Sequence, residues 1–213
     1  MTYTPEQFHT LRDEFLKLTQ PYGADEPMSS NMWNEINIQY TQRHRAYHTL
    51  HHLENMLIEL NGIKDEIEDW DATLFALFYH DIIYSVTKKN NEEKSAALAD
   101  KRLSAIHFPT DRKLRCINSI LATKAHGDSS DSDTNLFTDT DLCILGASPE
   151  KYKTYCNQVR KEYSLYPDFL YNPGRKKVLQ HFLSMERIFK TDHFYNHYEQ
   201  DARVNILNEI EML

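Results

Sequence analysis

The stretch Trp70-Asp-Ala-Thr-Leu-Phe-Ala-Leu-Phe-Tyr-His-Asp81 decides the fold of this chain. From Leu74 to Tyr79 every side chain is apolar, so all sides of a helix built from this segment avoid water. We therefore expect a helix from Trp70 to about Asp81 at the centre of the fold. A charged Asp81 at its buried end is costly unless it is paired or bound to a cation.

Helical patterns lie on both sides of this central stretch. Apolar residues recur at helical spacing, and several segments begin with a capping residue followed by proline. The expected helices begin near Thr4, near Ser30 or Asn31, at about 49, 91 and 110, at Ser148-Pro149, at Asn172-Pro173 and at about Asp192. Residues 127–135 are predicted to form one polar loop between them.

The predicted fold class is all-α, with one domain spanning 1–213. Only five glycines occur in 213 residues, which disfavours sandwiches and barrels because these need many glycine turns. There is no internal repeat and no linker long enough to divide domains.

Composition excludes several classes of protein. A formal net charge of -8 argues against a duplex nucleic acid partner, although a small anionic ligand can still bind at a local positive charge. Three cysteines without CxxC spacing suit a reducing compartment. The N-terminal residues lack an apolar signal core, and no apolar run approaches the roughly 20 residues of a membrane span. We therefore expect a cytoplasmic protein that does not enter membranes.

The eleven histidines carry the functional signal. His48 and His52 lie four residues apart and are expected to share one face of the helix near 49–61, with His51 about a quarter-turn away. Such a pair is often only a surface feature, but His80-Asp81 and the carboxylates Asp139 and Asp141 follow on later predicted helices. Imidazoles and carboxylates without thiolates suit a divalent ion that keeps an open position for water. Alternatively, Asp141 acts only as a helix N-cap.

Several motifs resemble the HD superfamily of metal-dependent phosphohydrolases, whose signature is H…HD…D. They are most similar to the predicted HD phosphohydrolase family of small bacterial proteins, and they run from about residue 40 to 208. The matching segments are Tyr47-His48-x-x-x-His52, Phe78-Tyr79-His80-Asp81-Ile-Ile-Tyr84, Asn91-Glu-Glu-Lys-Ser95-Ala96, Ala122-Thr-Lys-Ala-His126, Asp139-Thr-Asp141-Leu-Cys-Ile-Leu-Gly146 and Ala202-Arg203-Val-Asn205.

The resemblance implies a role for each matching residue. It makes His52, His80, Asp81 and Asp141 the metal ligands, and it prefers Asp141 to Asp139 because Asp-Leu directly precedes the apolar turn. It places His48 at the position of the catalytic acid, while Asp81 both binds the ion and orients water. It also places His126 among the residues that line the site, as a contact to a second metal or to phosphate. Apart from the resemblance, Lys124, Lys88 and Lys89 are candidate cations for the phosphate, although each can equally be a plain surface lysine, and Tyr84 is a further candidate substrate contact.

This chain departs from the family pattern at two positions. Many members carry HDxxK, but Tyr84 stands where that lysine would be, so phosphate must meet another cation. Thr49 replaces the asparagine that follows the first histidine in the related cyclic-nucleotide phosphodiesterases, which weakens a cyclic-nucleotide assignment.

The predicted function is hydrolysis of a small phosphoester by hydroxide generated on a divalent ion, with a nucleotide as the expected substrate. The ion itself, Mn, Mg, Co, Ni, Fe or Zn, is left open. Two alternatives remain: a non-catalytic metal- and nucleotide-binding sensor, and an HD-fold di-iron oxygenase. A ferritin-like di-iron site is disfavoured because only Glu6-x-x-His9 has the required spacing. Calcium binding by Asp128–Asn135 is also disfavoured, since Leu136 and Leu142 replace the EF-hand glycine and glutamate.

Overall fold

The computed structural model describes residues 8–213, and this part of the chain is all-α. The predicted fold class is confirmed. The chain divides into two compact units, Met1–Gly127 and Asp128–Leu213. The expectation of a single domain stays a prediction. The cap proposed at Thr4 lies outside the described residues.

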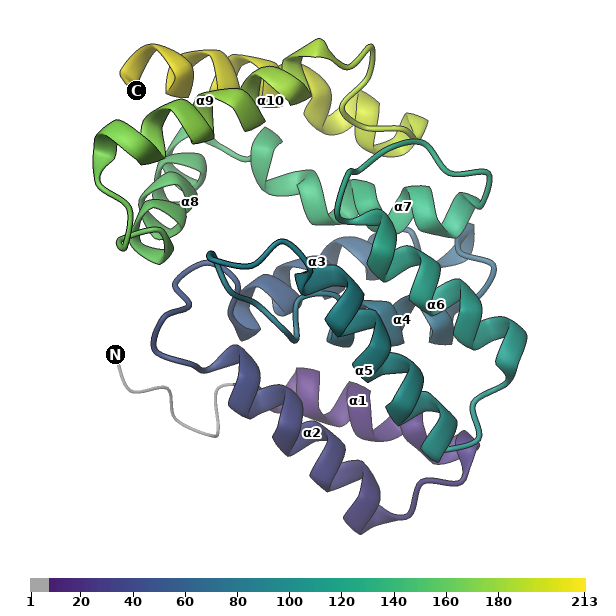
Figure 1. The fold of residues 1–213 in the computed structure, drawn as a ribbon. Coiled ribbons are helices and arrows are strands. Elements are labelled where there is room, and N and C mark those ends of the chain that lie inside the picture. The colour runs from purple at the N-terminus through teal and green to yellow at the C-terminus, as the bar shows by residue number, and fades with distance from the viewer. Residues whose placement is uncertain (1–7) are drawn as a thin grey trace. The chain divides into compact units, whose positions relative to one another are not determined.

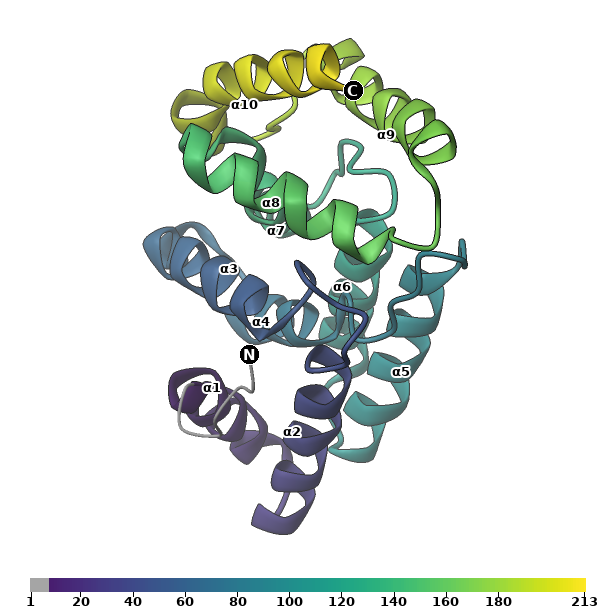
Figure 2. The ribbon, with the colours of Figure 1, turned by 90° about the vertical axis from the view of Figure 1, so that its left-hand side faces the viewer.

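The first unit is built around the central stretch. Its helix α4 (Trp70–Tyr79) packs against four other α-helices of the unit, and Figures 1 and 2 show α3 running beside it. Every residue from Ala72 to Tyr79 is buried, as its uniformly apolar sequence predicts. The other elements are α1 (His9–Thr19), η2 (Gln20–Tyr22), α2 (Glu26–Tyr40), α3 (Leu50–Gly62), η3 (Lys64–Glu66), α5 (Asn91–Ala105) and α6 (Thr110–Ala122).

Helix α2 begins earlier than the sequence suggested. Its N-cap is Asp25, whose carboxylate accepts a hydrogen bond from the Met28 amide at 2.8 Å. Pro27 lies in the first turn, where its missing N–H costs nothing. The expected start at Ser30 or Asn31 is therefore wrong, because the true cap-and-proline pair stands further upstream.

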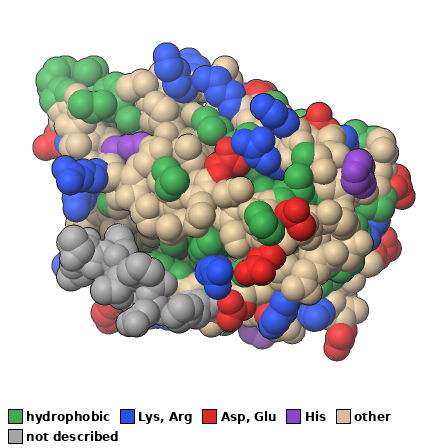
Figure 3. Space-filling view, turned by 90° about the horizontal axis from the view of Figure 1, so that it is seen from below, with side chains coloured by type: hydrophobic (Ala, Val, Ile, Leu, Met, Phe, Trp, Pro, Cys, Tyr) green, Lys and Arg blue, Asp and Glu red, His purple; other side chains and the backbone are tan. Residues whose placement is uncertain are grey.

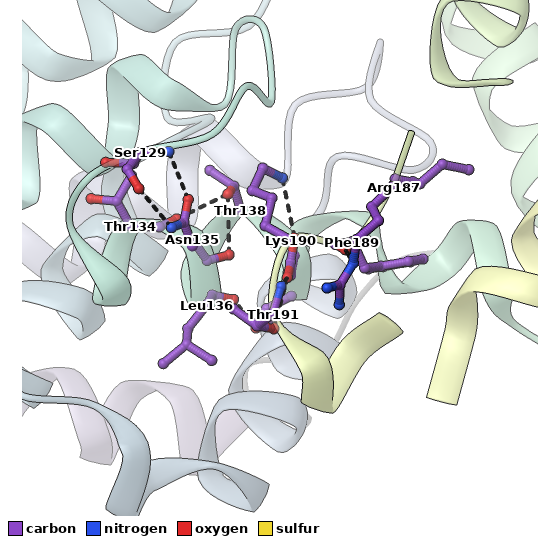
Figure 4. Close-up of polar contacts among 12 residues, drawn as sticks. Ser129, Thr134, Asn135, Leu136, Thr138, Arg187, Phe189, Lys190 and Thr191 are labelled. Carbon is purple, nitrogen blue, oxygen red and sulfur yellow. Dashed lines mark hydrogen bonds and ion pairs between the residues drawn. The ribbon is translucent and has the colours of Figure 1, made fainter. Parts of the chain in front are cut away.

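The second unit begins inside the segment predicted to be a loop. Helix α7 (Ser132–Leu142) is capped by Asp131, whose carboxylate accepts bonds from the amide and the hydroxyl of Thr134. Asn135 bonds back to both backbone groups of Ser129 (Figure 4). The remaining elements of this unit are η4 (Cys143–Gly146), α8 (Pro149–Glu162), α9 (Asp168–Ser184) and α10 (Asp192–Met212).

Helix α9 also begins earlier than predicted, at Asp168 rather than at Asn172-Pro173. Pro173 lies inside the helix, where it removes one backbone hydrogen bond. The starts of α8 at Pro149 and of α10 at Asp192 agree with the prediction.

One face of the molecule carries side chains of mixed charge. On the face drawn in Figure 3, cationic and anionic side chains are interspersed among polar and apolar ones. Within residues 8–213, no helix combines the length and the apolar character that crossing a bilayer requires.

Candidate metal centre

Three of the predicted ligands converge in the first unit. His52 lies on the first turn of α3, and His80 and Asp81 directly follow the last turn of α4. One ligand atom from each lies within 4.8 Å of the other two. Residues 28 positions apart in the chain meet here because α3 packs on α4.

The donor spacings fit ligands around one ion. His52 Nε2 lies 3.2 Å from His80 Nε2, and His80 Nε2 lies 3.3 Å from Asp81 Oδ2. Atoms held at about 2.1 Å from one metal are themselves roughly 3.0–3.4 Å apart. The spacing within each pair is therefore that of two atoms in one coordination sphere.

The tautomer of His80 follows from its other nitrogen. Nδ1 lies 2.9 Å from the carbonyl oxygen of Leu77, which can only accept, so this nitrogen carries the hydrogen. In neutral His80 the lone pair then belongs to Nε2, which faces Asp81 and His52. This lone pair can accept a hydrogen bond from His52 Nε2, 3.2 Å away, or bind a cation. The contact of Nδ1 with a backbone carbonyl is typical of a metal-binding histidine.

His48 approaches the same carboxylate from a different element. Its Nε2 lies 3.7 Å from Asp81 Oδ2, and its ring packs on that of Tyr84 with centroids 4.2 Å apart. The side chain of His80 is fully buried, whereas His48 and Asp81 are 22% and 17% exposed. The side of the cluster that carries His48 is therefore open to solvent.

The expected helical pairing of His48 with His52 is wrong in its geometry. Helix α3 begins at Leu50, its N-cap Thr49 is extended, and His48 lies in the bend before it. The two rings still lie within 5.9 Å of each other. His51 points elsewhere, as predicted, and contacts Glu54 at 3.3 Å.

The other predicted substrate contacts are placed in the first unit as follows. Tyr84 contributes its ring to His48, as described above. The ammonium of Lys124 contacts the Glu93 carboxylate and donates to the carbonyl of Lys89 at 2.9 Å. His126 follows α6 with a left-handed backbone (φ 50°) and is partly buried. Their assignment to substrate stays a prediction.

Of the two candidate carboxylates in the second unit, Asp139 is used within that unit. It is fully buried and accepts bonds from the amides of Lys190 and Thr191, the Lys190 ammonium and the Thr191 hydroxyl. Figure 4 shows Lys190 and Thr191, the two residues that donate these bonds. These four bonds occupy both carboxylate oxygens of Asp139, while the preference for Asp141 over Asp139 stays a prediction. Asp141 lies on the last turn of α7 and is half-buried, and its role as a ligand stays a prediction.

Other residues of the quoted motifs hold the chain in place. Ser95 exchanges hydrogen bonds with both backbone groups of Ile83, and Asn91 donates to the Ser85 carbonyl. These contacts anchor the segment that follows Asp81. In the second unit, Arg203 bonds to the carbonyls of residues 183, 185 and 186, and Asn205 to those of 145 and 147.

Sequence reasoning missed two residues that support the site. Arg45 is buried and donates to backbone carbonyls of His48, Asp81 and Ile82. The Tyr40 hydroxyl accepts from the Asp81 amide at 3.2 Å. Arg45 lies in a non-helical segment with other polar residues, so no periodicity marks it as buried.

Comparisons of the chain with protein-family models, with curated proteins and with solved structures gave no match. The functional interpretation therefore depends on the geometry of the histidine–aspartate cluster and on the motifs themselves.

Proposed function

We propose that this protein is a metal-dependent hydrolase of a small phosphoester, with a nucleotide as the expected substrate. The observation that carries the proposal is the convergence of His52, His80 and Asp81 within 4.8 Å. A divalent ion bound there lowers the pKa of water toward about 7 and polarises the phosphoryl group.

The chain's own residues supply the remaining steps. Asp81 is the residue proposed to orient water, because its side chain is partly exposed to solvent. His48, whose Nε2 lies 3.7 Å from Asp81 Oδ2, is the proposed proton donor to the leaving oxygen. The ring of Tyr84 packs on the imidazole and limits its rotation.

Three further residues belong to the proposal. The resemblance gives Asp141 as a fourth ligand and His126 as a contact to the phosphate, and Lys124 is proposed as a cation that neutralises phosphate charge. Asp141→Asn tests the first of these: a ligand role predicts weaker metal binding with unchanged secondary structure.

The proposal is tested by a hydrolysis screen. Protein loaded with Mn²⁺, Mg²⁺, Co²⁺, Ni²⁺, Fe²⁺ or Zn²⁺ is incubated with nucleotides and generic phosphoesters. His52→Ala should lose metal and activity together, while the neighbouring His51→Ala is the matched control and should keep both.

Two other results would replace the proposal. Confirmed metal binding with nucleotide affinity but no turnover would favour a sensor. Colour and dioxygen consumption with iron would favour the oxygenase.

A further inference from the structure

Arg45 is a buried cation, only 6% exposed, at the junction of the two segments that carry the candidate acid and a candidate ligand. Its Nη1 atom donates to the carbonyl of His48 at 3.1 Å and to that of Asp81 at 2.8 Å. Its Nη2 atom donates to the carbonyl of Ile82 at 2.9 Å. One nitrogen thus joins the backbones of residues 48 and 81.

Aromatic rings hold the guanidinium in this place. Its central carbon lies 4.8 Å from the centroid of the Tyr40 ring and 5.3 Å from that of Tyr84. The same two tyrosines act on the site directly, because Tyr40 accepts from the Asp81 amide and Tyr84 packs on His48. Arg45 is therefore fixed by residues that also touch the candidate catalytic groups.

The chemistry of the contact requires arginine. A planar guanidinium donates in several fixed directions at once, and it tolerates burial against aromatic faces. A lysine ammonium is a single point of positive charge and is more strongly hydrated, so it cannot span the same three carbonyls. Removing the donors would leave the partly buried carbonyls of His48 and Asp81 and the buried carbonyl of Ile82 without this shared partner.

We propose that Arg45 is a positioning residue that sets the separation of His48 from Asp81. The expected effect on turnover rests on the proposed function, whereas the expected effect on the distance from His48 to Asp81 does not. Loss of Arg45 lets the segment before α3 move away from the end of α4, so the acid and the carboxylate no longer meet at 3.7 Å.

The test compares the full-length Arg45→Met and Arg45→Lys variants with Arg102→Lys. Arg102 is the matched control because its guanidinium also lies in the first unit and forms a paired contact, with Glu35 on α2. Three readouts are taken: the visible spectrum of bound Co²⁺, kcat and KM on a p-nitrophenyl phosphoester at saturating Co²⁺, and the metal-free crystal structure of Arg45→Met.

Arg45→Met should change the Co²⁺ spectrum and lower kcat by about 10–100-fold with little change in KM, as loss of outer residues around metal sites does. The Co²⁺ spectrum and the kcat of Arg45→Lys should lie between those of Arg45→Met and those of the wild type. Arg102→Lys should lower thermal stability but leave the spectrum and kcat unchanged. If Arg45→Met does not fold, Arg45→Lys carries the same readouts.

A folded Arg45→Met protein with the wild-type spectrum and kcat would overturn the inference. If the wild type binds Co²⁺ but hydrolyses nothing, the proposed function fails, and the spectrum still decides the role of Arg45. If the wild type binds no Co²⁺, the crystal structure decides it. A lengthened distance from His48 Nε2 to Asp81 Oδ2 supports the inference, and an unchanged one rejects it.

Discussion

One oxygen atom, Oδ2 of Asp81, lies 3.3 Å from His80 and 3.7 Å from His48. The two histidines differ in burial, since His80 is enclosed and His48 reaches solvent. A ligand benefits from a fixed, buried position, whereas a proton donor must reach the substrate. This difference in burial supports the proposed division of roles, with His80 as a ligand and His48 as the proton donor.

Alanine substitution separates the roles of the histidines. His52→Ala should abolish metal binding and turnover together, because a neutral imidazole contributes directly to affinity. His48→Ala should keep the metal and lower kcat by on the order of 10²–10⁴-fold. Metal content by elemental analysis and kcat, both measured on the same samples, separate loss of metal from loss of turnover. Equal metal loss from both variants would make His48 a ligand and remove the proposed acid.

A second residue-scale prediction concerns stability in the unit formed by residues 128–213. Glu209 forms a buried pair with Arg175, and its hydrogen bonds to Arg175 lower its pKa below the ordinary 4.5 despite burial. A lowered folded-state pKa means that the charged carboxylate stabilises the fold above the unfolded pKa, and that this contribution is lost as pH falls through the folded value.

Glu209→Gln should therefore destabilise the protein by roughly 1–3 kcal/mol near neutral pH, the range for a hydrogen bond to a charged group. The difference from wild type should shrink as pH falls below about 4.5. Thermal unfolding followed by circular dichroism at several pH values measures it. Glu211→Gln, an exposed change on the same helix, is the control. A deficit that is constant with pH would show that the carboxylate charge is not what stabilises the pair.

At the scale of elements, helix identity was predictable and helix ends were less so. The apolar run of α4 specifies a buried helix without help from the rest of the chain, and its end places His80 in the core and Asp81 at its edge. The spacing of His48 and His52 suggested one helical face, but the extended backbone at Thr49 ends the helix between them. Proximity of the two rings therefore comes from the bend before α3, which periodicity cannot detect.

Local capping explains why the predicted starts of α2 and α9 are late and why the predicted loop at 127–135 contains the start of α7. Asp25 caps α2 upstream of the candidates Ser30 and Asn31, and Asp131 caps α7 within a run of polar residues where several caps compete. Asn172-Pro173 predicts a helix start, yet Pro173 lies in the interior of α9. The role of Asp139 could not be read from the sequence either, because its partners Lys190 and Thr191 lie about fifty positions away along the chain.

Two glycines of the second unit give an element-scale prediction. A Cβ on Gly146 in η4 would lie 2.6 Å from the backbone oxygen of Tyr198 on α10, whereas a Cβ on Gly174 in α9 meets nothing within 4 Å. Gly146→Ala should cost about 1–3 kcal/mol through overpacking. Gly174→Ala should add about 0.5–1 kcal/mol because alanine loses less entropy in a helix.

Urea unfolding of both variants beside wild type measures these opposite shifts in midpoint. If Gly146→Ala were as stable as wild type, the close approach of η4 to α10 would be incorrect.

At the scale of the whole molecule, an acidic chain holds a cluster of imidazole and carboxylate groups in a helical unit. The net charge of -8 repels long polyanions, so the expected ligand is small and is attracted by the bound ion rather than by the surface. The first unit alone supplies His52, His80 and Asp81, with Arg45 and Tyr40 holding the Asp81 backbone.

The central claim is that His52, His80 and Asp81 bind one divalent cation. The most direct measurement is anomalous diffraction at the metal edge from crystals of protein purified without chelator and soaked in Mn²⁺ or Co²⁺. We predict one strong anomalous peak about 2.0–2.3 Å from His52 Nε2, His80 Nε2 and an oxygen of Asp81. A fully occupied metal elsewhere in the molecule, with these three side chains unliganded, would contradict the account.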